Sequence, residues 1–117
     1  MKKIFLLAVC TVIISVSYAQ KLTPDEAAKR IGDTVTVCGK IYGGKFFDKN
    51  KLTLLNMGAA YPKSPLTIVI YGENRDKFKN APEVFYSNKN VCIKGLVQEF
   101  KGKPQIIIKK ENEIITE

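Results

Sequence analysis

The segment from Leu66 to Gly72 constrains the fold more than any other, because its side chains alternate with the two-residue period of a β-strand. Three aliphatic side chains at alternate positions would face a core, and Tyr71 would lie on the opposite face. We predict that this segment is the central strand of a small barrel.

Four further segments have the character of strands. They cover about residues 33–42, 52–57, 90–100 and 105–108. Gly39 and Gly95 lie in the middle of two of them, where a strongly curved strand needs a bend or a bulge. The connection at residues 43–50 is predicted to be a loop or hairpin tip.

A short helix is predicted near the start, within residues 22–32. Thr23 is a suitable N-cap, and Gly32 can end the helix in the left-handed conformation. The side chains expected to pack this helix against the barrel are Leu22, Ala27 and Ile31.

A second helical piece is predicted at residues 73–80, between the third and fourth strands, with Phe78 as its core anchor. Phe85 and Tyr86 follow it and are expected to plug one end of the barrel. Five short strands, mid-strand glycines and this insertion describe an all-β protein. The predicted fold is a five-stranded Greek-key barrel of the oligonucleotide/oligosaccharide-binding (OB) type, with a short N-terminal helix and a helical insertion between strands 3 and 4.

Residues 1–19 have the three parts of a secretory signal peptide: Lys2 and Lys3, an apolar run, and a small-residue cleavage site ending at Ala19. A membrane anchor is the alternative, but about thirteen apolar residues fall short of the roughly 20 needed to span a bilayer. We therefore predict a secreted or periplasmic protein, with residues 20–117 as one OB domain and no membrane span after cleavage. Cys10 would leave with the signal.

The mature chain is basic. Without Lys2 and Lys3 it has 17 basic and 11 acidic residues, a net charge of +6. This excess favours anionic partners such as nucleic acid, anionic lipid or acidic polysaccharide, and does not choose among them. The charge could also serve solubility alone.

Two cysteines remain, Cys38 and Cys92, each alternating with aliphatic residues that should face the core. Both thiols are therefore expected to point outward, and a disulfide is possible if their strands are antiparallel neighbours. Two unpaired thiols, or one thiol buried under the N-terminal helix, are the alternatives. No metal site or cofactor is predicted, because the chain has no His and two cysteines do not make a zinc cage.

No catalytic motif is visible. The absence of His removes His-based acid–base chemistry, no acidic cluster has metal-ligand spacing, and no glycine pair matches a phosphate-binding loop. The sequence therefore favours a binding protein over an enzyme.

The chain resembles small secreted bacterial OB-fold domains that occur alone or beside extracytoplasmic nucleases. The similar segments are residues 33–41, 55–58 with 61–62, 66–72, 91–95 and 101–106. The paired cysteines and the Lys101-Gly-Lys-Pro-Gln-Ile106 turn are its more specific parts. The resemblance implies nucleic acid binding. We expect single-stranded targets to be favoured over double-stranded ones, with little sequence preference because rings stack on any base, and with modest affinity because the expected binding face has few aromatic residues. A module that binds an envelope protein, a polysaccharide or a small ligand is the alternative.

An OB-type site would occupy the outer face of strands two and three, between the loops that join strands one to two and four to five. Aromatic rings there would stack on bases, and ammonium groups would meet phosphates. The predicted binding residues are Lys40, Tyr42, Lys45, Phe46, Phe47, Lys51, Tyr71, Lys101 and Lys103.

Overall fold

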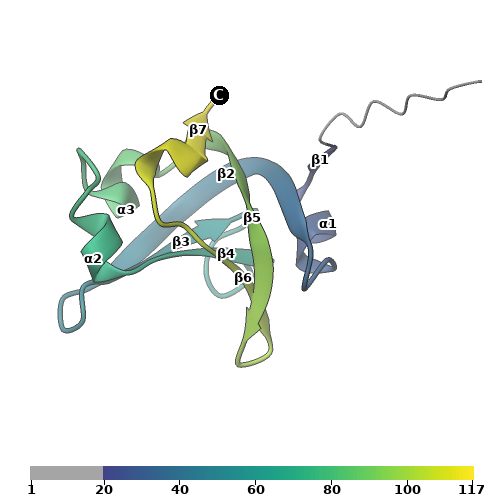
Figure 1. Cartoon of the computed structure of the whole chain (residues 1–117), viewed down its shortest axis with the longest axis horizontal. Helices are drawn as coiled ribbons and strands as arrows, with labels where there is room; N and C mark the ends of the chain where they lie inside the picture. The colour runs from purple at the N-terminus through teal and green to yellow at the C-terminus, as the bar shows by residue number, and fades with distance from the viewer. Residues whose placement is uncertain (1–19) are drawn as a thin grey trace, which may run out of the picture.

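The computed structural model describes residues 20–117 as a mostly β domain with short helices (Figure 1). The predicted signal peptide, including Cys10, lies outside the described residues. The strands are β1 (Lys21–Leu22), β2 (Thr34–Phe47), β3 (Leu52–Met57), β4 (Leu66–Ile70), β5 (Asn90–Phe100), β6 (Lys103–Ile107) and β7 (Ile114–Thr116). The helices are α1 (Pro24–Ala28), α2 (Gly72–Arg75), α3 (Pro82–Phe85) and the 3₁₀ turn η1 (Glu111–Glu113). Among residues 20–117, none of these helices has the length and apolar character needed to cross a bilayer.

Five strands close into a ring of hydrogen-bonded pairs in the order β2, β3, β4, β6, β5 and back to β2. Every pair in the ring is antiparallel except β4 and β6, which are parallel. The short strands β1 and β7 extend the sheet beside β2 and β5. The predicted β architecture and the insertion between the third and fourth strands of the ring are confirmed.

The core lies inside this ring. Leu66, Ile68 and Ile70 of β4 are fully buried, as the alternation predicted. The strands around them contribute further inward side chains, and Phe78 from the insertion joins the same cluster, as expected for its anchor. Burying each of these large aliphatic side chains stabilises the fold by about 1.5–3 kcal/mol.

Strand β2 is longer than predicted. It runs through Phe47, so residues 43–47 are strand rather than loop. The register with β3 shifts between Ile41 and Gly44, which is a β-bulge. Gly43 supplies the positive φ of 100° at this bulge, and Gly44 lets β2 approach the backbone of β3 closely. The two glycines therefore bend the strand instead of ending it.

The other mid-strand glycines serve close packing rather than a bulge. A Cβ on Gly39 would lie 2.6 Å from the ring of Pro24 in α1, and one on Gly95 would lie 2.6 Å from Ile106. Both positions must therefore remain small. The predicted bend or bulge at these two glycines lies instead at Tyr42–Gly43.

Helix α1 is a five-residue helix with a capped N-terminus. Thr23 accepts a hydrogen bond from the backbone N–H of Glu26, whose carboxylate in turn accepts one from the N–H of Thr23. Thr23 is therefore the N-cap, as predicted, and the two hydrogen bonds together form a capping box. Leu22 and Ala27 are buried, but Ile31 is exposed, because the helix ends at Ala28 and Ile31 lies in the following turn. The prediction of packing was wrong for Ile31.

The insertion has two one-turn helices instead of a helix over residues 73–80. Tyr86 is buried beneath the end of α3, as predicted, whereas Phe85 is 37% exposed. Consecutive residues of a helix point in different directions, so only one of this pair can face the core. Phe85 does not plug the barrel.

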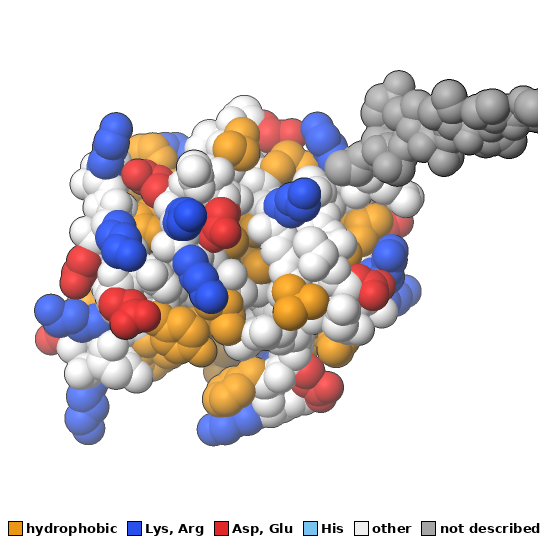
Figure 2. Space-filling view, viewed as in Figure 1, with side chains coloured by type: hydrophobic (Ala, Val, Ile, Leu, Met, Phe, Trp, Pro, Cys, Tyr) orange, Lys and Arg blue, Asp and Glu red, His pale blue; other side chains and the backbone are white. Residues whose placement is uncertain are grey.

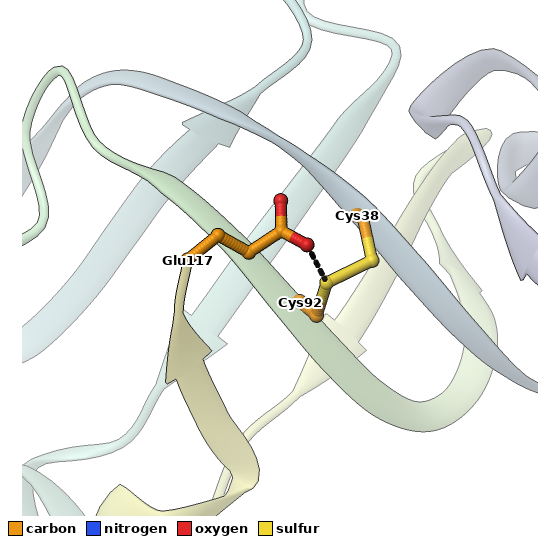
Figure 3. Close-up of a disulfide and its surroundings, with 3 residues drawn as sticks. All are labelled: Cys38, Cys92 and Glu117. Atoms are coloured by element: carbon orange, nitrogen blue, oxygen red, sulfur yellow. Dashed lines mark hydrogen bonds between the residues drawn. A yellow bond between two sulfur atoms is a disulfide. The ribbon is translucent and has the colours of Figure 1, made fainter.

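Cys38 and Cys92 are directly opposed in the antiparallel β2–β5 pair and form a disulfide (Figure 3). Both cysteine side chains point outward, as predicted. Their neighbours Val37 and Ile93 are fully buried, and adjacent residues of a strand face opposite sides. Glu117 Oε2 lies 3.2 Å from Cys92 Sγ. A disulfide sulfur carries no hydrogen, so this is a close contact and not a donated hydrogen bond.

Candidate functional site

The outer side of β2 carries a row of alternating cationic and aromatic residues. Lys40 Nζ lies 5.1 Å from the ring centroid of Tyr42, and Lys45 Nζ lies 5.1 Å from that of Phe47. Tyr42 follows the inward-facing Ile41, and the bulge brings Lys45 back to the same outer side. We call Lys40, Tyr42, Lys45 and Phe47 the β2 stripe.

The strands beside this stripe form the β3–β4 face, which is apolar at its centre. Cross-strand register places Leu54 of β3 beside Lys45, and Val69 of β4 beside Leu54. Ile107 of β6 continues the row. The next row is polar and contains Asn56, Thr67 and Gln105.

The β5–β6 hairpin, residues 100–103, borders this face on the other side. Phe100 is paired with Lys103 across the turn and is 57% exposed. Lys101 Nζ lies 5.3 Å from the centroid of the Phe100 ring. The strands β2 and β5 therefore each end, next to a loop that flanks the face, in a phenylalanine with a lysine above its ring.

Hydrophobic side chains gather along the lower edge of the view in Figure 2, where the molecule is hollowed. The β2–β3 loop and the β5–β6 hairpin point toward this edge in Figure 1, and basic side chains stand at both of its ends in Figure 2. Among residues 20–117, only Arg30 and Arg75 form ion pairs. The lysines at this edge therefore carry charge that no carboxylate neutralises by direct contact.

Phe46 does not belong to this face. It is paired with the buried Thr53, and its ring is covered by the guanidinium of Arg75 at 3.9 Å. Arg75 is fixed in turn by Glu83, whose two carboxylate oxygens accept hydrogen bonds of 3.1 and 2.8 Å from Nη2. Of the two adjacent phenylalanines, the structure leaves Phe47 on the outer side.

Tyr71 lies at the end of β4 rather than on its outer surface. It is the residue before α2, and it is 46% exposed. Lys51, in the β2–β3 loop, lies next to Gly72, where an added Cβ would come within 2.8 Å of the Lys51 Cβ. The structure therefore brings Lys51 beside Tyr71 at one corner of the face.

The predicted site residues thus divide into groups. The β2 stripe, Lys51 with Tyr71, and the hairpin lysines Lys101 and Lys103 border one surface, whereas Phe46 packs elsewhere. Sequence reasoning missed Phe100. Its position beside the basic turn, two residues beyond the outward Gln98, could have indicated it.

Metal-ligating side chains come together at one place in the described residues, where Cys38, Cys92 and Glu117 place their donor atoms within 4.8 Å of one another. Both sulfurs are joined in the disulfide and are not thiolates. This group therefore does not act as a metal site in the oxidised protein.

No protein-family model matches the chain. No curated protein matches it in sequence either. Among solved structures, the chain is similar to a protein described as an aspartyl-tRNA synthetase from Leishmania major Friedlin, with a TM-score of 0.51 and 10% identity. The similarity covers 92% of this chain and 23% of that protein, so the chain spans about a quarter of its length. This likeness and the strand topology give the chain an OB-like fold.

Proposed function

We propose that this chain is a secreted or periplasmic OB-barrel protein that binds single-stranded nucleic acid across the β3–β4 face, with modest affinity and little sequence preference. It acts by binding and not by catalysis. The observation that carries the proposal is the placement of Phe47 and Phe100, each with a lysine above its ring, at the ends of the strands β2 and β5, next to the two loops that flank the face.

Exposed phenyl rings and free ammonium groups match the two parts of a nucleotide. Every base has a π-face that stacks on an aromatic ring, whatever its identity, and lysine pairs with phosphate. In the free protein the lysines lie above the rings. An exposed cation–π contact is worth about 0.5–1 kcal/mol, whereas stacking a base is worth about 1–3 kcal/mol. A base can therefore displace the lysine, which then turns to a phosphate.

The face favours single strands because bases in a duplex are already stacked on one another. Its centre limits affinity, since Leu54 and Ile107 are only partly exposed, Val69 between them is buried, and none of the three offers a stacking surface. The similar solved structure is named for an enzyme that acts on tRNA, and this agrees with a nucleic acid ligand. Fold alone does not establish function, so the side chains carry the proposal.

A protein of the cell envelope is the second candidate. The partly exposed Leu54 and Ile107, together with the exposed Tyr71 and Phe100, form an apolar surface of the kind that protein partners bury. Such a partner would gain most from apolar contacts, so its affinity would depend little on salt. Nucleic acid would show a strong dependence.

Fluorescence anisotropy of a labelled mixed-sequence single-stranded oligonucleotide, titrated with the purified protein, distinguishes a nucleic acid ligand from an envelope protein partner. The four lysines around the face, Lys45, Lys51, Lys101 and Lys103, would each contribute about 0.7 to the slope of log affinity against log salt for a single strand. The total of about 2.8 corresponds to a loss of roughly 50-fold between about 50 and 200 mM salt.

The test variant is Phe47→Ala with Phe100→Ala, which removes both rings and keeps the lysines. We expect at least a tenfold loss of affinity, since about 1–3 kcal/mol is lost per base stack. Lys94→Ala with Leu96→Ala is the matched control, because it removes an exposed lysine and an exposed apolar residue from the outer side of β5, two strands away from β3. Absence of binding at low salt, or equal loss in both variants, would refute the proposal.

A further inference from the structure

A second pair of cationic and aromatic residues lies outside the β3–β4 face. Phe85 at the end of α3 is exposed, and Lys89 Nζ lies 3.6 Å from the centroid of its ring. Tyr86 turns into the core and contacts the Phe85 ring edge to face, at 4.9 Å between centroids. The buried Tyr86 therefore fixes the position of Phe85 at the surface.

This pair adjoins one end of the β2 stripe. Asn88 N–H donates a hydrogen bond of 2.8 Å to the carbonyl of Ile41, and Ile41 N–H donates one of 2.9 Å to the carbonyl of Lys89. Ile41 is the residue between Lys40 and Tyr42. The backbone of the segment after α3 is therefore held directly against the start of the stripe.

We call Lys40, Tyr42, Phe85 and Lys89 the corner cluster. Neither lysine forms an ion pair within residues 20–117. Glu83 is occupied by its two hydrogen bonds from Arg75. Glu117 donates its backbone N–H to the carbonyl of Asn90, the residue opposite Lys40, but its carboxylate lies against the disulfide, with Oε2 3.2 Å from Cys92 Sγ. The cluster thus presents two exposed rings and two uncompensated cations, which is the chemistry of the face flanked by Phe47 and Phe100.

We propose that the corner cluster is a second contact site for single-stranded nucleic acid, which receives the part of the strand that runs past the β3–β4 face. The inference rests on the proposed function and extends it. Continuity along β2 supports it, because Tyr42 and Phe47 lie on one outer side of a single strand, about 16 Å apart by residue count. An oligonucleotide long enough to leave the face at Phe47 and follow β2 reaches Tyr42 and then Phe85.

The consequence is a dependence of affinity on length. Oligonucleotides of about 4 nucleotides fill the face alone, whereas strands of about 12 to 16 nucleotides reach the corner cluster as well. A longer oligonucleotide also offers more overlapping positions at which a short site can bind, and this alone raises the measured affinity. We expect the affinity to rise with length by more than this statistical gain. The rise should stop once the corner cluster is occupied.

The experiment measures anisotropy of labelled oligothymidylates of both lengths with the unmodified protein and with Phe85→Ala plus Lys89→Ala. We expect the variant to lose about fivefold or more in affinity for the long strand and to bind the short strand unchanged. Lys94→Ala with Leu96→Ala is again the control. A second variant, Lys89→Glu, leaves the ring in place and reverses one charge, so it tests the site even where the double variant folds poorly.

The outcomes separate this inference from the proposed function. If short strands bind and the corner variants leave long-strand affinity unchanged, the corner cluster is not a contact site, although the β3–β4 face is. If neither length binds, both proposals fail. If the variants weaken short and long strands equally, the effect lies in the face or the fold and the second site is refuted.

Discussion

Removing the Cys38–Cys92 disulfide should destabilise the domain strongly, because the bond joins residues far apart in the sequence. The cysteines are separated by 54 residues. A cross-link over a loop of about that length restricts the unfolded chain by about 4 kcal/mol in the loop-entropy model. Domains of this size have a free energy of unfolding of about 5–15 kcal/mol, so the loss is a large share of the total.

The assay is urea unfolding and thermal unfolding of Cys38→Ala with Cys92→Ala beside the unmodified oxidised protein. A loss of about 4 kcal/mol corresponds to a fall in Tm of roughly 15 to 30 °C for a domain of this length. The dependence of the unfolding free energy on urea should also become steeper, because the unfolded chain without the cross-link exposes more surface.

The matched control is Thr36→Ala with Lys94→Ala, the neighbouring opposed pair in the same two strands. It removes a cross-strand contact worth about 0.2–1 kcal/mol and leaves the disulfide intact. If the cysteine variant were no less stable than this control, the loop-entropy reasoning would be wrong. Two free thiols in the unmodified protein, measured under denaturing conditions without reductant, would show that the bond does not form.

Three further substitutions test the interior. Thr53→Val should leave the free energy of unfolding unchanged or raise it by up to about 1 kcal/mol in urea unfolding, because the buried Thr53 hydroxyl has no hydrogen-bond partner in the part of the chain that the structure describes, residues 20–117. A large loss of stability would contradict this. Gly44→Ala should destabilise by about 1–3 kcal/mol, since the new Cβ would meet the Leu54 carbonyl oxygen; an unchanged Tm would contradict this close approach. The pKa of Tyr86 is raised above 10.0 by burial and then by the charge of Glu111, so the unfolded chain loses this proton first. Stability should be unaffected below about pH 10 and fall as pH rises through the folded pKa, and Tyr86→Phe should flatten that fall in urea unfolding against pH.

The regular strands could be predicted because two-residue periodicity is a local property. The buried aliphatics of β4 and the bounds of β5, Asn90–Phe100, agree with the sequence pattern. The end of β2 could not be predicted in the same way. A Gly-Gly pair is compatible with a turn or a bulge, and the choice depends on contacts with β3 across the sheet.

The candidate site depended on the same long-range information. Alternation indicated that Cys38 and Cys92 point outward, but their pairing required the β2–β5 register. A loop has no regular alternation of side chains, so a loop over residues 43–50 does not predict whether Phe46 or Phe47 faces outward. Once β2 extends through Phe47, the alternation assigns the outer side to Phe47, and Arg75 covers the ring of Phe46.

The bulge in β2 connects the fold to the proposed function. Tyr42 and Lys45 are three residues apart, and in a regular strand an odd separation places side chains on opposite faces. Here two residues, Tyr42 and Gly43, lie opposite Asn56 of β3, so Ile41 and Gly44 are both paired with inward-facing residues, the buried Met57 and Leu55. Tyr42 and Lys45 consequently share the outer side. Without the extra residue, half of the β2 stripe would point into the interior of the ring of strands. The bulge that bends β2 therefore also keeps the aromatic and ammonium groups of the stripe on one side of the strand.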